Sequence, residues 1–285
     1  MHTSKIEWVL NPDNKTLGKI WNPITGCLNH TDGMCKGGGF PCYAYRLAHG
    51  RLKERYLANK NIAPTSLPYN ISTMLADNDP FYPRFWEDRL EELITRNEYL
   101  DGNVPIPTKP RGIFVCDMAD LFGIGVPEEW TKRVLDAIDF NKYHDRFYLL
   151  TKQPQNLIKF SPFPDNCWVG VTACNEAMWA EALWQLSKIQ ASIKYISIEP
   201  FLKRIPQYAG GIKNCGIDWL IIGSQTKPNV YPRIEWVKEI VEAANKTGIP
   251  VFLKDNLWPL FDGSHYAVPM WAFGKDSRLR QEMPK

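Results

Sequence analysis

Long hydrophobic stretches are absent from this 285-residue sequence. No apolar run approaches the roughly 20 residues that a membrane-spanning helix needs, so we expect no membrane partner. No signal peptide precedes the first motif, and the seven cysteines are odd in number. Both features are typical of proteins in a reducing compartment, where disulfides are rare. We therefore expect a cytoplasmic protein with free thiols.

A strong excess of charge is also absent. The formal net charge is +3, with 23% charged and 44% hydrophobic residues, which describes a soluble globular protein. Lysine and arginine are scattered, without the compact basic stripe that a nucleic-acid groove needs. The mild positive charge permits an anionic substrate without requiring one. Eleven tryptophans and twelve tyrosines supply core packing and rings that can stack on a flat ligand.

Three cysteines stand close together in one glycine-rich loop. Cys27, Cys35 and Cys42 fall within sixteen residues, and three consecutive glycines occupy residues 37–39. Thiolates at close spacing on a flexible loop suit a metal ion or an iron–sulfur cluster. Three ligands leave one coordination position open, which a catalytic centre needs and a structural one avoids.

Other interpretations of this loop remain open. A structural zinc site would take a fourth ligand from His30 or His49, although the paired Cys-x-x-Cys spacing of zinc modules is missing. Disulfides do not suit a reducing compartment. Unrelated buried thiols are common, since cysteine is often a core residue. The cluster interpretation accounts best for three cysteines in one loop.

Apolar runs and helical patterns alternate along the chain. The expected buried strands cover residues 19–25, 113–115, 147–150, 168–171, 195–198, 219–222 and 251–253. The expected helices cover residues 43–57, 128–140, 154–159, 175–190 and 233–247. Alternating β and α elements predict an α/β fold with a parallel sheet. We interpret seven such strands as a partial or near-complete (β/α) barrel.

One segment interrupts this pattern. Residues 58–110 contain seven prolines and an acidic and aromatic stretch from residue 81 to residue 97. We interpret the segment as an insertion or lid between the first helix and the second strand. The whole chain, residues 1–285, is then a single barrel domain.

Candidate functional residues follow the expected strands, because the chemistry of such barrels lies at the carboxyl ends of the strands. The candidates in chain order are Asp117, Asp120, Lys152, Thr172, Asn175, Glu199, Gly223 and Lys254. Glu199 is the strongest, since a carboxylate ending an apolar strand is costly to bury without a partner. Alternative roles are a turn cap for Asp120, a solvated side chain for Lys152 and an ion pair with Asp255 for Lys254.

Several short motifs follow one another along the chain. They are Ser4-Lys5-Ile6-Glu7-Trp8, Trp21-Asn22-Pro23, Gly26-Cys27, Cys42-Tyr43-Ala44 and residues 118–122, 150–154, 168–171, 197–200 and 217–223. Together they resemble a phage-associated family of uncharacterised radical-SAM-like proteins, and the likeness covers most of the chain. The family usually has two residues between its second and third cysteines, whereas six separate Cys35 from Cys42. The better-known radical SAM spacing of three and then two residues is absent. Inserted glycines can absorb the difference.

The resemblance implies a radical S-adenosylmethionine (SAM) enzyme with a barrel of the radical SAM type. Cys27, Cys35 and Cys42 would hold a [4Fe-4S] cluster, and SAM would bind the fourth iron. An external one-electron donor of the flavodoxin or ferredoxin type would reduce the cluster. The phage setting favours a nucleobase in DNA or RNA, or a nucleotide precursor, as the substrate.

The resemblance also implies roles for the residues that follow the strands. Asp117 and Asp120 would hold the amino group of SAM, Thr172 and Asn175 would contact its ribose, and Gly223 would let the backbone approach its adenine. Glu199 would bind SAM and act in catalysis, and Lys152 would meet the SAM carboxylate or an anionic substrate.

Two other classes of function compete with the radical enzyme. One is a zinc- or cluster-stabilised nucleic-acid-binding barrel without catalysis, which leaves Glu199 without a purpose. The other is a plain barrel enzyme, such as a metal-independent hydrolase, for which the sequence offers no pairing of nucleophile and base.

Overall fold

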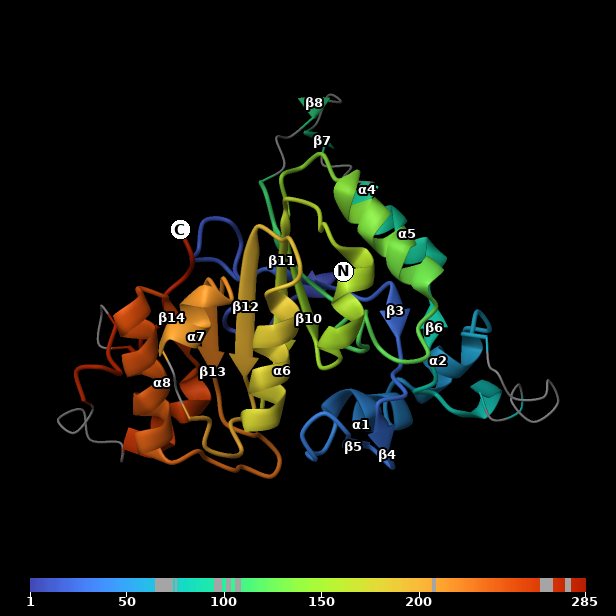
Figure 1. The fold of residues 1–285 in the computed structure, drawn as a ribbon. Helices are drawn as coiled ribbons and strands as arrows, with labels where there is room; N and C mark the ends of the chain where they lie inside the picture. The colour runs from blue at the N-terminus through green and yellow to red at the C-terminus, as the bar shows by residue number, and fades with distance from the viewer. Residues whose placement is uncertain are drawn as a thin grey trace. The chain divides into compact units, whose positions relative to one another are not determined.

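The computed structural model describes residues 1–64, 74, 76–94, 99–100, 104–105, 109–206, 209–261, 269–274 and 278–285. Its main sheet has eight strands in the order β1-β2-β9-β10-β11-β12-β13-β14 (Figure 1). The expected α/β class with a mostly parallel sheet is confirmed. β1 and β14 stand at the ends of the strand order, so no closed barrel is shown among the described strands.

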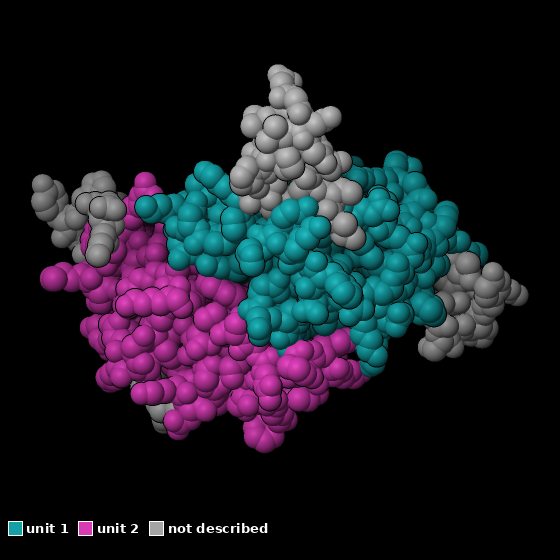
Figure 2. All heavy atoms as spheres, turned by 90° about the horizontal axis from the view of Figure 1, so that it is seen from above, with its two compact units in different colours: residues 1–36, 40–149, 163–167 teal, residues 37–39, 150–162, 168–285 magenta. Residues whose placement is uncertain are grey.

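The chain divides into two compact units, which Figure 2 colours separately. Unit 1 contains residues 1–36, 40–149 and 163–167, and unit 2 contains residues 37–39, 150–162 and 168–285. The elements of each unit are described separately below.

Unit 1 contributes the first strands of the sheet. β1 (His2–Thr3) pairs antiparallel with β2 (Lys19–Trp21), and β9 (Gly112–Val115) pairs in parallel with both β2 and β10 (Arg146–Thr151). The last two residues of β10 belong to unit 2. The strand expected over residues 19–25 is interrupted at Pro23, which has no N–H for a ladder. Beyond it, β3 (Ile24–Thr25) pairs antiparallel with β6 (Arg84–Phe85).

The helix expected over residues 43–57 is two helices, α1 (Tyr43–His49) and α2 (Lys53–Ala58), because the chain leaves helical geometry at Gly50. α5 (Glu128–Asp139) starts after Pro127 as expected, with two acids in its first turn. The shorter elements of unit 1 are β4 (His30–Thr31), β5 (Met34–Cys35), η1 (Glu87–Arg89), α4 (Glu91–Ile94), β7 (Tyr99–Leu100) and β8 (Val104–Pro105), where η marks a 3₁₀ helix.

Unit 2 contains four parallel strands with helical connections. The strands are β11 (Cys167–Thr172), whose first residue belongs to unit 1, β12 (Ile193–Ile198), β13 (Trp219–Ile222) and β14 (Val251–Leu253). The helices are η2 (Pro154–Phe160), α6 (Glu176–Leu186), α7 (Ala209–Asn214), α8 (Ile234–Thr247) and η3 (Asp255–Phe261). Every residue of β11, β13 and β14 is buried, as expected for strands covered on both faces.

The expected insertion, residues 58–110, lies partly outside the described residues. Its described part packs into the core of unit 1. Phe81, Arg84, Phe85 and Leu93 are each at most 1% exposed, and Ile62 forms a bridge with Arg84. That residues 58–110 act as a lid stays a prediction. Across the described part of the chain, no helix has the length and apolar character needed to cross a membrane.

Arg84 provides a test of this packing. Its buried guanidinium donates from Nε to Tyr56 O (2.7 Å), from Nη1 to Tyr82 O (3.2 Å) and from Nη2 to Ala76 O (3.1 Å). Arg84→Met leaves these carbonyls without their donor, so we expect the free energy of unfolding in urea to fall by about 3 kcal/mol. Arg204→Met, which removes an exposed pair with Glu239, is the control and should change it little. Equal effects of the two changes would contradict the structural role of Arg84.

Candidate functional site

The cysteine loop starts from β3 and is fixed by backbone hydrogen bonds within unit 1. The Gly26 N–H donates to Met118 O, and the Cys27 N–H donates to Phe81 O, both at 2.9 Å. Gly26 has a φ of +91°, and a Cβ there would lie 2.4 Å from Tyr82 O. Because only glycine fits this approach, the placement of Cys27 depends on Gly26.

A small hairpin carries the middle of the loop. β4 and β5 pair antiparallel across Asp32 and Gly33, both with positive φ, which is the Asp-Gly turn favoured by two-residue hairpins. Cys35 in β5 is buried, and its N–H donates to Phe40 O (2.9 Å). The Cys42 N–H donates to Gly33 O (2.8 Å). The hairpin therefore holds the backbone of the second and third cysteines.

Cys27, Cys35 and Cys42 form no disulfide among the described residues, and two of them share one packing surface. Cys27 and Cys42 pack against a single buried cluster, formed by Ala44, Ala48, Tyr56, Phe81 and Met118. Within the described ranges, no three His, Cys, Asp or Glu side chains gather closely enough to hold a metal ion. Three thiols are nevertheless the type of donor that an iron–sulfur cluster takes. To hold a cluster, the loop would have to bring Cys35 and the other two thiols together.

The two histidines considered for a zinc site both lie against Tyr45. The ring centres of His30 and Tyr45 are 4.8 Å apart, and those of His49 and Tyr45 are 3.9 Å apart in a stacked arrangement. His49 Nε2 lies 3.6 Å from Asp79 Oδ1. Burial lowers the pKa of His30 and so favours its neutral form.

The loop after β9 lies beside the start of the cysteine loop. Gly26 forms a bridge with Ala119, next to the hydrogen bond to Met118. Cys116 is buried with a φ of +62°, which is uncommon for a residue with a side chain. Burial raises the pKa of its thiol to about 12, so it is protonated near neutral pH. A sparsely populated backbone conformation of this kind is found often at functional sites.

Asp117 is the acid that this loop presents. Its Oδ1 accepts a hydrogen bond from Asn22 Nδ2 (2.6 Å), and its carbonyl accepts one from the Tyr43 hydroxyl. Burial raises the pKa of Asp117, an effect opposed by the Asn22 hydrogen bond. Asp120 instead uses its Oδ1 to accept from the Phe122 N–H (3.1 Å), which is the turn-capping role.

In unit 2, Glu199 and Lys254 form an ion pair at the ends of β12 and β14. Gly223 directly follows the intervening strand β13, and a Cβ there would lie 3.0 Å from Lys254 Cδ and 3.1 Å from Glu199 Cδ. The missing side chain therefore makes room for the pair. Asp255, which the sequence offers as another partner for Lys254, uses its Oδ1 to accept from Gln281 Nε2 (2.9 Å).

The other expected residues of unit 2 have varied surroundings. Thr172 is buried at the end of β11, where it pairs with Ser197 of β12. Asn175 caps α6, because its Oδ1 accepts from the Met178 N–H (3.0 Å). Lys152 follows β10 and is partly buried.

Sequence reasoning did not identify Asn22 and Tyr43 as site residues. Both lie within the motifs that carried the resemblance, but their partner Asp117 is more than seventy residues away. A sequence motif shows that such residues occur together, and only the fold shows what they contact.

Comparisons with known proteins place most of the chain in one family. The sequence model described as "Protein of unknown function (DUF5131)" matches residues 3–270, a range that includes the cysteine loop and every expected site residue. No curated protein and no solved structure matches the chain.

Asp117 should give the protein a measurable pH dependence. Because burial raises its pKa, the folded state favours the protonated carboxyl more than the unfolded chain does. Its contribution to stability is present below the unfolded-state pKa of about 4 and is lost as pH rises through the folded-state pKa. We expect Asp117→Asn to gain in unfolding free energy relative to the parent between pH ~4 and 7. The exposed Asp165→Asn change is the control. A parent–variant difference that stays constant with pH would contradict the burial of this carboxyl.

The Glu199–Lys254 pair can be tested by a double-mutant cycle in urea denaturation. Glu199→Gln and Lys254→Met should each lower the free energy of unfolding by about 1.5–3 kcal/mol, the range for charge-assisted hydrogen bonds. The double variant should lose less than the sum, because neither charge then remains without its partner. The exposed Lys238–Glu242 pair is the matched control, with an expected coupling of about 0.3–0.5 kcal/mol. Coupling no larger than this control would show that the pair is unimportant.

Proposed function

The chain belongs to the family described as "Protein of unknown function (DUF5131)", and we propose that it is a radical SAM-type enzyme. Cys27, Cys35 and Cys42 would ligate a [4Fe-4S] cluster, with SAM as the second cofactor. The substrate would be an organic molecule, with a nucleobase in phage or bacterial nucleic acid as the preferred class. The fold would be a partial barrel of the radical SAM type, and the protein would work in the cytoplasm with a flavodoxin- or ferredoxin-type electron donor.

One observation carries the proposal most directly. The loop that carries Cys27, Cys35 and Cys42 is hydrogen-bonded to the loop that presents Asp117, through Gly26 and Met118. Thiolates can hold iron, and a carboxylate beside them can hold the amino group of a bound amino-acid cofactor. The two loops that carry these kinds of ligand are therefore neighbours within unit 1.

When bound, the cluster would supply the electron that cleaves SAM and starts radical chemistry. Asp117 would accept hydrogen bonds from the SAM ammonium group, and that positive charge would favour the ionised carboxylate against the cost of burial. Asn22 would keep the carboxylate oriented, because its Nδ2 already donates to Asp117 Oδ1. Asp120, engaged as a turn cap, would act by shaping this loop.

The residues of unit 2 would bind and orient the cofactor and substrate. Glu199 would accept hydrogen bonds from SAM, while Lys254 offsets its charge in the resting protein. Thr172 and the amide N–H₂ of Asn175 would contact ribose hydroxyls. Gly223 would act by leaving room for the Glu199–Lys254 pair, and Lys152 would meet an anionic group of the SAM or substrate.

The alternative is a zinc- or cluster-stabilised nucleic-acid-binding protein without catalysis. Basic side chains in and around α1 and α2 favour it, since residues 43–60 include five lysines and arginines and a single acid. Metal content separates the zinc form of this alternative from the proposed enzyme, and cleavage of SAM by the iron-loaded protein separates the cluster form.

Anaerobic purification with iron and sulfide analysis tests the proposal. We expect a brown protein with about four irons per chain, and Cys27→Ala, Cys35→Ala and Cys42→Ala should each lose most of this iron, because each removes one cluster ligand. Cys116→Ala and Cys174→Ala, at buried thiols outside the loop, are matched controls that should retain it. Colourless protein with one zinc would favour the alternative, and iron loss in the Cys116→Ala control would refute the ligand assignment.

A further inference from the structure

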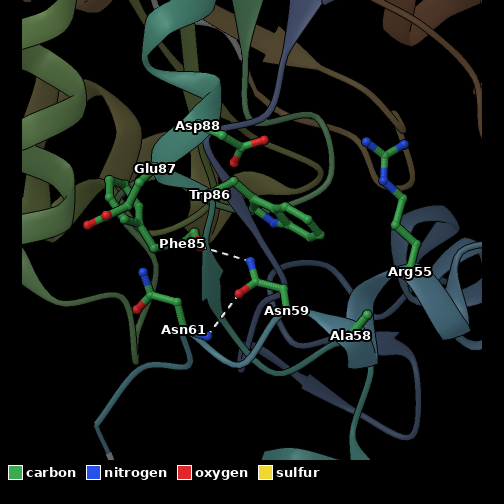
Figure 3. Close-up of a pocket in the computed structure, with 8 residues that line it drawn as sticks. All are labelled: Arg55, Ala58, Asn59, Asn61, Phe85, Trp86, Glu87 and Asp88. Carbon is green, nitrogen blue, oxygen red and sulfur yellow. Dashed lines mark hydrogen bonds between the residues drawn. The ribbon is translucent and has the colours of Figure 1, made fainter.

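Unit 1 contains a pocket that none of the proposed cofactor residues lines. Its volume is about 480 Å³, within the range of small-molecule sites. One side comes from α2 and the residues after it, including Arg55 and Ala58. The other comes from the segment that runs from β6 into η1, including Trp86 and Asp88 (Figure 3). The pocket therefore lies within one compact unit.

The indole of Trp86 is held in place by several contacts. Its backbone N–H donates to Pro23 O (2.8 Å), and its Nε1 donates to the buried hydroxyl of Thr25 (2.9 Å). The guanidinium of Arg89 lies over the ring, 3.9 Å from its centre, and Arg89 Nη1 donates to Asn22 O (2.6 Å). A ring held by this many contacts loses little freedom when a ligand stacks on it.

Charged groups of opposite sign flank this ring. The Arg55 guanidinium lies 5.8 Å from the centre of the Trp86 ring, and Figure 3 shows Asp88 beside the ring with Arg55 across the open space. Arg55 belongs to the basic segment 43–60, so the α2 side of the pocket carries positive charge. The acid next to Asp88, Glu87, accepts from Arg133 Nη1 (2.7 Å), which offsets its charge.

We propose that this pocket binds a nucleotide. The base would stack on Trp86, an exocyclic amino group would donate to the Asp88 carboxylate, and the phosphate would lie against Arg55. A nucleotide combines a flat ring, a hydrogen-bond donor and an anion, which are the three groups that the pocket complements. The ligand is a free nucleotide or a nucleotide within a single strand. The inference shares a ligand class with the proposed function but needs neither cluster nor SAM.

Equilibrium binding to the full-length protein tests the proposal. The probes are AMP, followed by calorimetry, and a fluorescein-labelled single-stranded hexadeoxynucleotide, followed by anisotropy. Trp86→Ala removes the stacking surface, and Ala58→Trp fills the pocket from an exposed position without removing a structural contact. Trp184→Ala is the matched control, because Trp184 is an exposed tryptophan of unit 2 with Lys188 Nζ stacked 3.9 Å from its ring.

We expect Trp86→Ala and Ala58→Trp to weaken binding by about 5- to 150-fold, the range for loss of one base stacked on an aromatic ring. Arg55→Glu should weaken AMP binding, whereas Lys53→Glu, on the same helix but outside the pocket, should not. If the source is a single strand, the hexanucleotide will bind more tightly than AMP, and Arg55→Glu will lower the salt slope by about one. Equal affinity for both probes identifies a free nucleotide.

Two results would overturn the proposal. One is that the parent protein binds neither probe at millimolar concentration, and the other is that folded Ala58→Trp binds as tightly as the parent. Because iron content is measured separately, a protein without iron that binds AMP at Trp86 would remove the radical SAM function and leave this inference intact. A protein with a full cluster and no nucleotide affinity would refute this inference and leave the radical SAM function standing.

Discussion

The hydrogen bonds of Asn22 hold together the parts of unit 1 on which both candidate sites depend. Its Nδ2 donates to Asp117, its Oδ1 accepts from the Met118 N–H (3.2 Å), and its carbonyl accepts from Arg89. The same residue thus orients the carboxylate beside the cysteine loop and anchors the arginine that backs Trp86. Asn22 and the following proline also end β2, so one short interruption of a strand provides these contacts.

Much of the sheet could be predicted because buried parallel strands are continuous apolar runs whose identity does not depend on their neighbours. β13 and β14 lie where the sequence places them, and β9 to β12 extend the expected runs by one or two residues at one or both ends. β3 and β6 were not predictable in this way. Each has two residues, and their pairing joins segments about sixty residues apart, which no local pattern encodes. The break between α1 and α2 could have been predicted from Gly50, because glycine weakens a helix interior.

The sequence predicted where candidate site residues lie along the chain, but not which of them contact each other. The rule that chemistry follows parallel strands located Glu199 and Lys254 separately. Their pairing depends on strand order, since β13 and the Gly223 that follows it separate the two strands in the sheet. Trp86 was missed for another reason. Its segment was interpreted as a lid from its prolines and acids, whereas Arg84 and Phe85 beside it are core residues.

The short bridge between Met34 and Pro41 has a consequence for how sequences of this kind should be compared. Together with the hydrogen bond from the Cys35 N–H to Phe40 O, it closes the base of the stretch between the second and third cysteines. Residues can then be added or removed beyond this closure at little entropic cost, because the free energy of closing a loop rises only slowly with its length. Cysteine spacing is therefore a weak criterion for alignment here. The residues that close the loop, Met34 and Pro41, are the more informative positions to match between homologues.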